Sequence, residues 1–448
     1  MVSLIARIEA ATPADRDRFL DAVRVASILL VVLGHWVVRV VTSDDDELRT
    51  GYLLAVAPAS QWVTLLVQVM PLFFLVGGAV NAQSWRRARE QGSTAADWMT
   101  LRARRLLRPT LPLIAVLVPV ACLMVNVWPD HALLLDFRAA IFPLWFLAAY
   151  LLVTALTPLT LAWHERHGSM LLLAAGGIVT LVVDGLRFTV GADGPWLGTQ
   201  PAVAAINVIV VWLVIHQLGF IWADDGLPTK AATQGALMLA GGALLIVMIG
   251  WGPYPLTMVP IEGSRAPNNG GPPTAALYAL TLMQLGIVLA LRRSVTAWLA
   301  RPGIWAPVAL IGAGLMTVYL WHQPVLVLMT NLAYPLGWMP VTETVDLSWW
   351  LWRLPWVALC TIVLTVVVLV VQRFETGHTK ISGETAGRHA LLLRAAGVLL
   401  FCVGVAGFIH TGLVQEGLPL QLPWVPLLAF FAGLWGLGAI GGVARVNR

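Results

Sequence analysis

Charged residues are scarce in this chain, in which Asp, Glu, Lys and Arg together make up 11% of 448 residues. Soluble domains carry roughly 25% charged residues. Hydrophobic residues account for 58% of the sequence, and many form runs near the roughly 20 residues that a helix needs to cross a bilayer core. The scarcity of charge therefore excludes an ordinary soluble protein and indicates a polytopic integral membrane protein.

Cysteine is scarce as well. The three cysteines, Cys122, Cys360 and Cys402, all lie inside apolar runs, which argues against a disulfide framework or a zinc site. No cleavable signal peptide is expected either, because the first apolar run follows a polar stretch with both signs of charge and is long enough for a permanent span. No metal and no permanently bound cofactor are expected.

Twelve apolar segments are long enough to be membrane spans. They cover residues 21–42, 56–81, 107–128, 142–163, 169–187, 201–222, 231–251, 274–291, 305–331, 348–371, 391–412 and 420–441. Such runs must be helical in lipid, because every backbone amide needs a partner within its own segment, whereas a β-barrel would show short alternating stretches. The sequence therefore predicts an all-α transmembrane helical bundle of about twelve spans.

The connections between these segments differ in their content of basic residues. With the N-terminus in the cytosol, the cytosolic side holds 21 Lys and Arg residues, the opposite side holds 6, and Arg24 lies inside the first span. Basic residues concentrate on the cytosolic side of membrane proteins. The bias predicts a multi-pass protein of the inner or plasma membrane with both termini cytosolic and the loops at 43–52 and 252–273 outside.

The first span, within RFLDAVRVASILLVVLGHW, contains two ionisable residues that a bilayer disfavours, Arg24 and His35. The eleven residues between them advance a helix by about 16 Å and return to nearly the same face. Asp21, one turn before Arg24, is placed to pair with it. A guanidinium near the cytosol suits a phosphate, and a deeper imidazole suits proton transfer. Alternatively, Arg24 reaches the headgroups and His35 bonds a neighbouring helix.

A second histidine site lies in GLMTVYLWHQPVLVL, where Tyr319 is one turn before His322. Counted from the cytosolic end of each span, His322 and His35 fall at comparable depth beyond the midplane. Pro324 is placed to open the backbone just after the histidine. The sequence predicts that these two histidines share one buried cavity. Two further histidines within spans have no such companions and are predicted to be structural: His216 and His410.

A basic segment, RARRLLRP at 102–109, lies at the cytosolic mouth of the third span. Arg102, Arg105 and Arg108 recur at three-residue spacing, so on a helix they would form one ridge suited to several phosphates. The alternative is a topology signal that contacts anionic lipid.

Taken together and in order, these blocks resemble acyltransferase family 3, the bacterial membrane O-acyltransferases that include O-antigen acetylases. The resemblance covers about 15–375, and its blocks are RFLDAVRVASILLVVLGHW, MPLFFLVGGAVNAQSW, RARRLLRP, FPLWFLAAYLL and GLMTVYLWHQPV. It implies a ten-helix core, acyl-CoA as the donor, and an arginine–histidine motif at Arg24 and His35. By the same match, Arg102 and Arg105 fit the family's paired arginines. Tyr319 and His322 fit its late tyrosine–histidine block.

The chain departs from the family pattern in two ways. Members often have Ser-Gly after the paired phenylalanines, whereas Val76-Gly77-Gly78 stands here, so no hydroxyl role is expected at this spot. Some members also carry a fused extracytoplasmic esterase-like domain. Because this chain ends soon after the last apolar segment, any final transfer is expected at the membrane domain or on a separate partner.

These observations predict a membrane O-acyltransferase that moves an acyl group, with acetyl as the expected one, from cytosolic acyl-CoA to a hydroxyl of a cell-envelope glycan or glycolipid. The donor phosphates would bind Arg24, Arg102 and Arg105, with Arg108 beside them. His35 would act as general base or carry the acyl group, and His322 and Tyr319 would orient the acceptor or stabilise the oxyanion. No nucleic-acid partner is expected.

The predicted division of the chain has four parts: a cytosolic segment 1–20, the acyltransferase core 21–375, a cytosolic linker 376–390, and two additional helices with a short tail at 391–448. The rival function is a transporter that moves a lipid or glycan without chemistry. The absence of an obvious two-fold repeat of broken helices disfavours it. A third reading, an inactive scaffold, is disfavoured by the intact Arg24, His35 and His322.

Overall fold

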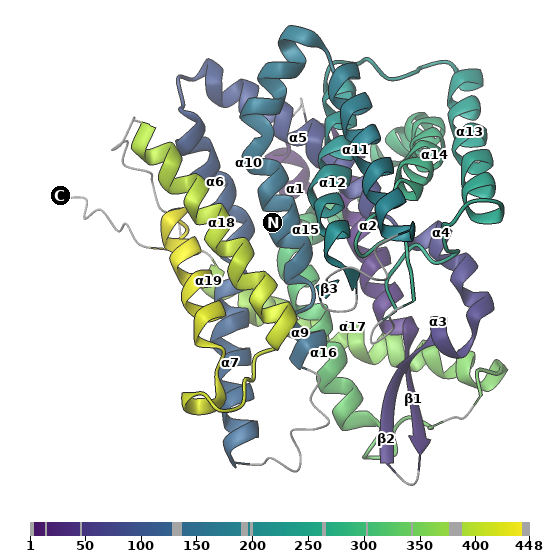
Figure 1. Cartoon of the computed structure of the whole chain (residues 1–448), viewed down its shortest axis with the longest axis vertical. Helices are drawn as coiled ribbons and strands as arrows, with labels where there is room; N and C mark the ends of the chain where they lie inside the picture. The colour runs from purple at the N-terminus through teal and green to yellow at the C-terminus, as the bar shows by residue number, and fades with distance from the viewer. Residues whose placement is uncertain are drawn as a thin grey trace.

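The chain forms a bundle of long helices in the computed structural model (Figure 1). Described here are residues 4–13, 16–44, 47–127, 137–189, 196–197, 200–261, 266–301, 303–341, 344–375 and 388–440. The predicted linker at 376–390 therefore lies mostly outside the described residues, and so do 262–265 of the predicted outer loop and residue 441 of the last predicted segment.

The first half of the bundle contains the elements that carry Arg24, His35 and the basic segment. Its helices are α1 (Leu4–Ala11), α2 (Arg18–Val38), α3 (Leu53–Val56), α4 (Thr64–Val67), α5 (Met70–Glu90), α6 (Ala95–Leu107), α7 (Thr110–Val127), α9 (Phe137–Ile141), α10 (Leu144–His167) and α11 (Met170–Thr189), with a 3-10 turn at Pro58–Val63. Its strands are β1 (Arg39–Asp44) and β2 (Glu47–Tyr52).

The second half begins with a short hairpin of two-residue strands, β3 (Trp196–Leu197) and β4 (Gln200–Pro201). A 3-10 turn follows at Ala202–Ala205. Its helices are α12 (Ile206–Ala223), α13 (Ala231–Gly250), α14 (Ala276–Leu299), α15 (Trp305–Ala313), α16 (Leu315–Ala333), α17 (Leu347–Glu375), α18 (Arg388–Thr411) and α19 (Trp424–Gly436), with a 3-10 turn at Pro419–Gln421 before α19.

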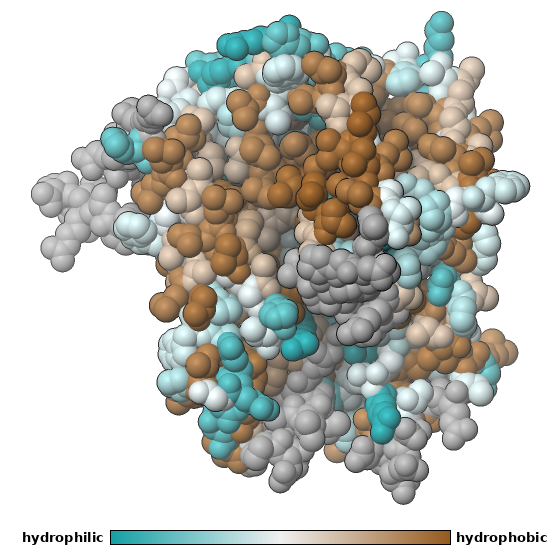
Figure 2. Space-filling view, in the orientation of Figure 1, coloured by the Kyte–Doolittle hydropathy of each residue, from teal (hydrophilic) through white to brown (hydrophobic). Residues whose placement is uncertain are grey.

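Within the described residues, ten helices are long and apolar enough to cross a membrane, or eleven if α15 and α16 form one bent span. The flank of the molecule is covered by hydrophobic side chains, and hydrophilic ones gather along its upper edge (Figure 2). Large apolar side chains such as Leu159 and Leu66 are 71% and 72% exposed. A soluble protein rarely exposes apolar surface on this scale, so the chain is a multi-pass membrane protein.

The ninth predicted span, 305–331, is not one straight helix. It is divided into α15 and α16, whose axes differ by 69°. Gly314 lies at the break, and a β-carbon there would collide with the side-chain amide of Gln372 on α17. Gly314 at the bend therefore lies close to the side chain of Gln372, a long-range contact that hydropathy does not report.

The twelfth predicted span, 420–441, is shorter than expected. The structure places a 3-10 turn and the 13-residue helix α19 there. At 1.5 Å per residue this helix covers about 20 Å, less than the roughly 30 Å of a bilayer core. The turn after Leu418 interrupts what hydropathy reads as one run.

The first predicted span also ends early, because α2 stops at Val38 and the chain enters the antiparallel hairpin β1–β2. Arg39 pairs with Tyr52, and the register runs to Asp44 opposite Glu47. The run Val40-Val41-Thr42 is β-branched, which favours a strand over a helix. Apart from the two short hairpins, the described fold is all-α.

Candidate active site

The two histidines that the sequence placed at similar depth meet in the bundle. His35 lies in the last turn of α2, and His322 lies on α16. Nδ1 of His35 is 2.9 Å from Nε2 of His322, and the two rings stack with centroids 5.1 Å apart. His322 is completely buried, and His35 is partly exposed. The structure therefore joins two residues 287 positions apart into one hydrogen-bonded pair.

The second nitrogen of His322 determines where the protons lie. Nδ1 of His322 is hydrogen-bonded to the backbone carbonyl of Tyr319. A carbonyl only accepts, so this nitrogen carries the proton, and Nε2 of the neutral ring offers a lone pair. His35 must then donate from Nδ1 to His322, which leaves the lone pair of its own ring on Nε2. This assignment follows from the hydrogen-bond partners.

Nε2 of His35 has no hydrogen-bond partner among the described residues. The ring is thus held in the tautomer that presents an unprotonated nitrogen, with a second histidine fixing its orientation. A base oriented by a third group is the arrangement found in catalytic triads.

Tryptophan side chains support this pair from the other side. The indole N–H of Trp36 donates to the carbonyl oxygen of His322 at 3.2 Å. The indole N–H of Trp356 on α17 donates to the carbonyl of Trp36 at 2.9 Å. Both indoles are buried, so α2, α16 and α17 are tied together directly beside the two imidazoles.

Tyr319 touches the pair differently from its predicted role. Its hydroxyl donates to the carbonyl of Pro143 at 3.2 Å, at the start of α10. Its carbonyl accepts from His322, and its ring centroid lies 5.5 Å from that imidazole. The phenol hydroxyl is therefore engaged by the Pro143 carbonyl, and Tyr319 contacts the histidine pair only through its backbone and ring.

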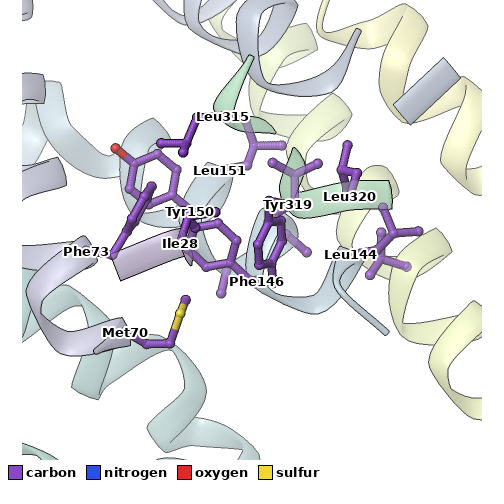
Figure 3. Packing of buried hydrophobic residues seen from close by; sticks show 14 of the residues in the cluster. Ile28, Met70, Phe73, Leu144, Phe146, Tyr150, Leu151, Leu315, Tyr319 and Leu320 are labelled. Atoms are coloured by element: carbon purple, nitrogen blue, oxygen red, sulfur yellow. The ribbon is translucent and has the colours of Figure 1, made fainter. Parts of the chain in front are cut away.

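Contacts between buried aromatic rings lead from Arg24 to the histidine pair. Figure 3 shows three of these rings, Phe73, Phe146 and Tyr319. The Arg24 guanidinium lies 5.8 Å from the centroid of Phe73, and it pairs with Asp21 at 3.6 Å, as the helical spacing predicted. Phe73 contacts Phe146 edge to face at 5.1 Å, and Phe146 contacts Tyr319 at 5.0 Å. We call Phe73, Phe146 and Tyr319 the aromatic wall. It spans the distance between the guanidinium and the two imidazoles.

The basic segment lies near Arg24. The Arg102 guanidinium donates to the carbonyl of Val80 at 3.4 Å and lies over the Trp98 ring at 5.5 Å. Its Nε is buried without a partner. Burial lowers the pKa of Arg102 to about 10, and the charges of Arg105 and Arg24 act in the same direction. The structure thus brings three of the predicted phosphate-binding arginines within electrostatic range of each other.

Neither Arg102 nor Arg105 forms an ion pair with a described carboxylate. Arg105 is exposed. A half-buried guanidinium with cationic neighbours and no counter-ion is costly. An anion held between these arginines would offset that cost, and guanidinium binds phosphate in bidentate geometry.

The remaining arginines of the segment behave differently. Arg104 turns away and donates from Nε to the carbonyl of Gly438 at 2.6 Å. Arg108 follows the last residue of α6 as its C-cap and is half-buried. The predicted ridge therefore has two members on α6 and a third at its end.

The two histidines predicted to be structural lie elsewhere. His216 is completely buried and is 3.1 Å from the side-chain amide of Asn81, which also donates to Thr154. His410 lies exposed on α18. In the parts of the chain described above, no three His, Cys, Asp or Glu side chains are grouped to hold a metal ion.

Comparison with known families decides what kind of protein this geometry belongs to. A family model described as an acyltransferase domain matches residues 17–372. The chain belongs to acyltransferase family 3. The domain implies O-acyltransferase activity, so chemistry is favoured over transport alone. No curated protein and no solved structure matches the chain. Helices α18 and α19 lie outside the matched residues.

Proposed function

We propose that the protein transfers an acyl group, with acetyl as the expected one, from cytosolic acyl-CoA to a hydroxyl of a cell-envelope glycan or glycolipid. The hydrogen-bonded pair of His35 and His322 carries this proposal, because it presents one unprotonated imidazole nitrogen. The aromatic wall, with Arg102 and Arg105 beyond it, supports a donor that has phosphates at one end and a thioester at the other.

The donor phosphates bind Arg24, Arg102 and Arg105, and Arg108 extends this set at the end of α6. Hydrogen bonds between arginine and phosphate are charge-assisted and are roughly twice as strong as neutral ones. The lack of described carboxylate partners around Arg102 and Arg105 supports this role. The pantetheine arm then runs along the aromatic wall and brings the thioester to His35.

Nε2 of His35 accepts the proton of the acceptor hydroxyl as the oxygen attacks the thioester carbonyl. The carbon–sulfur bond breaks, and the departing thiolate receives the same proton from His35. His322 holds the ring by accepting from Nδ1, and it shares the positive charge that develops on the pair. Every proton and electron pair is returned, so the products are the acylated acceptor and free CoA.

The same lone pair also serves a covalent route, in which Nε2 attacks the thioester and carries the acyl group. Incubation of the protein with radiolabelled acetyl-CoA and no acceptor separates the two. A burst of CoA equal to the enzyme, with label on His35, indicates the acyl-enzyme. CoA release only when acceptor is added indicates direct transfer.

Tyr319 is assigned a positioning role in this scheme. Its carbonyl fixes the tautomer of His322, and its phenol anchors α16 to Pro143. Oxyanion stabilisation, the alternative, requires a hydroxyl that is free to donate to the substrate. The hydrogen bond to Pro143 favours positioning.

The bias in basic residues supports an inner- or plasma-membrane location with both termini cytosolic. An even number of crossings requires the α19 segment to return the chain across the membrane, and local thinning of the bilayer accommodates a short apolar helix. In this orientation the β1–β2 hairpin and the 252–273 loop face outward. The core is assigned to 21–375, between the segment 1–20 and the linker 376–390, and the two added helices lie at 391–448.

Purified protein in lipid nanodiscs tests the function directly. Radiolabelled acetyl-CoA is incubated with a lipid and glycan extract of the cell envelope, and both free CoA and labelled acceptor are measured. We expect release of CoA that depends on the extract and disappears in the His35→Gln variant. Label that fails to enter any extract component, together with no release of CoA, would contradict the proposal.

A further inference from the structure

Tyr150 on α10 has a hydroxyl that the scheme above does not use. Its ring is buried between aromatic side chains, with centroids 5.6 Å from Phe73, 5.6 Å from Phe74 and 5.7 Å from Phe146. The hydroxyl oxygen has no hydrogen-bond partner among the described residues, yet it is not fully enclosed. Because most polar atoms of buried side chains are hydrogen-bonded within the protein, this oxygen is free to bind a partner that is not part of the chain.

A glycine on the facing helix holds the ring in place. A β-carbon at Gly77 on α5 would lie 2.6 Å from Cε2 of Tyr150 and 2.7 Å from its hydroxyl oxygen. Such distances are too short for a β-carbon, so the ring can lie this close to α5 because residue 77 is glycine. Gly77 therefore serves to seat Tyr150, in the block where the chain departs from the family's Ser-Gly.

The hydroxyl faces the arginine end of the aromatic wall. Tyr150 lies within electrostatic range of Arg102, and Phe73 contacts both Tyr150 and the guanidinium of Arg24. Figure 3 shows the tyrosine oxygen pointing away from Phe146 and Tyr319, which lie on the histidine side. The unpaired hydroxyl is thus placed between the proposed phosphate site and the proposed reaction site.

We propose that the Tyr150 hydroxyl is a binding contact for the donor, and that it hydrogen-bonds a polar group of the pantetheine arm between the phosphates and the thioester. The inference rests on the proposed function, because it takes acyl-CoA as the donor. An amide-bearing arm supplies both donors and acceptors, and a phenol offers one of each. A ring fixed by Phe74 and Gly77 loses little entropy when the arm binds.

The Tyr150→Phe variant tests this cleanly, since the hydroxyl has no described protein partner to lose. We expect unchanged thermal stability and a dissociation constant for CoA that rises roughly two- to twelvefold, as for one neutral hydrogen bond. Binding is measured calorimetrically in nanodiscs without acceptor. Adenosine 3′,5′-bisphosphate, which lacks the pantetheine arm, should bind the variant and the wild type equally.

The matched control is Tyr278→Phe, which removes a hydroxyl that is hydrogen-bonded to Thr180 on α11. It should leave CoA binding unchanged. Suppose that Tyr150→Phe binds CoA with unaltered affinity, while Arg102→Ala binds both CoA and adenosine 3′,5′-bisphosphate more weakly. That result would overturn the assignment of Tyr150 alone. Unaltered CoA affinity in Arg102→Ala as well would instead reject the proposed donor site.

A separate observation concerns α18 and α19, which lie outside the family match. Nε of Arg104 on α6 donates to the carbonyl of Gly438 at 2.6 Å, and Cγ2 of Thr100 on α6 also packs against Gly438. Arg394 on α18 donates to the carbonyl of Gly436 at 2.6 Å, within the hairpin itself. Two guanidinium groups thus bind carbonyls at the C-terminal end of α19, where the helix dipole favours positive charge.

We infer that the α18–α19 hairpin is a brace for α6, and that the bond between Arg104 and Gly438 fixes the rotation that turns Arg102 toward the donor. Arg104 is a positioning residue in this arrangement. A lysine at 104 keeps the charge but loses the planar guanidinium geometry. The substitution therefore separates positioning from simple attraction of an anionic ligand.

In Arg104→Lys we expect the dissociation constants of CoA and of adenosine 3′,5′-bisphosphate to rise together, about two- to tenfold, with kcat at saturating donor retained. The control Arg394→Lys changes the same chemical group at the same helix end but makes no described bond to α6, so it should bind both ligands normally. If Arg104→Lys binds both ligands with wild-type affinity, the inference that the hairpin braces α6 is wrong.

Discussion

Nδ1 of His322 donates to the carbonyl of Tyr319, and this bond determines which nitrogen of His35 is left without a proton. The two imidazoles alone could exchange donor and acceptor roles. The carbonyl removes that freedom because it cannot donate. The nitrogen of His35 that can act as a base is therefore determined by a backbone carbonyl on another helix. The predictions for the two histidines and Tyr319 follow from this chain of hydrogen bonds.

Replacing His35 tests the base itself. His35→Gln keeps much of the size and one hydrogen-bonding amide but cannot accept a proton at neutral pH. General acid–base catalysis contributes about 10²–10⁴-fold, so transfer should fall by that factor while expression stays near normal. His410→Gln, on the exposed face of α18, is the control. More than about a tenth of wild-type activity in His35→Gln would be incompatible with a catalytic base.

Replacing His322 tests the orientation of that base. His322→Phe preserves a ring but removes the acceptor for Nδ1 of His35, so the catalytic ring is free to adopt the other tautomer. Loss of a tautomer-fixing group reduces turnover by up to about 10⁴-fold in a catalytic triad. We expect kcat to fall by about a hundredfold or more, with donor affinity unchanged in calorimetry. A variant with wild-type kcat would show that His35 needs no such partner.

Tyr319→Phe separates positioning from oxyanion stabilisation. The lost hydrogen bond to Pro143 should lower the free energy of unfolding by about 1 kcal/mol, and kcat should stay within about threefold, because the carbonyl of residue 319 remains. An oxyanion donor would instead cost about 10²–10³-fold in kcat. Steady-state kinetics together with a thermal melt distinguishes these outcomes.

The arginines should act on donor binding. Arg102→Ala and Arg105→Ala each remove a charge-assisted contact, which costs about 1.5–3 kcal/mol or roughly ten- to a hundredfold in affinity for acyl-CoA. The apparent KM for the donor should rise more than kcat falls. Arg166→Ala, which removes an equally charged but exposed residue at the end of α10, is the matched control. If all three variants have the same donor affinity at low salt, the arginine cluster is only a topology signal.

The orientation is tested with single cysteines in a cysteine-free background. Thr50 in the β1–β2 hairpin and Ala266 in the 252–273 loop are exposed, as is Gln91 between α5 and α6. An impermeant thiol reagent should label cysteines at positions 50 and 266 in intact cells, and position 91 only after permeabilisation. The reverse pattern would place the termini outside. Asn268 is unsuitable because it is buried and hydrogen-bonded.

Much of this arrangement follows from local periodicity in the sequence. Counting residues along helices predicted the pairing of Asp21 with Arg24 and a common depth for His35 and His322, and the structure places both as predicted. The predictions of a multi-pass helical protein and of acyl transfer are confirmed by the bundle and the family match. These properties depend on helix geometry and on short motifs, which a single sequence displays.

Contacts between distant segments could not be predicted in the same way. Gly314 at the bend lies against the side chain of Gln372, the Tyr319 hydroxyl donates to the carbonyl of Pro143, and Arg104 donates to the carbonyl of Gly438. Each partner lies in a distant segment of the chain, and its position carries no periodic signal. The sequence contains one weak indication of a role for Tyr150, since it carries the only side-chain hydroxyl in FPLWFLAAYLL. Its contact with Gly77 on another helix could not be predicted.

The stacked imidazoles also limit how much charge the site can hold. One extra proton can be shared between His35 and His322, because the neighbouring ring and the Tyr319 carbonyl both stabilise it. Two imidazolium rings with nitrogens 2.9 Å apart would repel each other strongly in a low-dielectric interior. The pair therefore works as a store for a single proton, which must leave with the thiol before the next hydroxyl can be deprotonated, so each turnover resets the site.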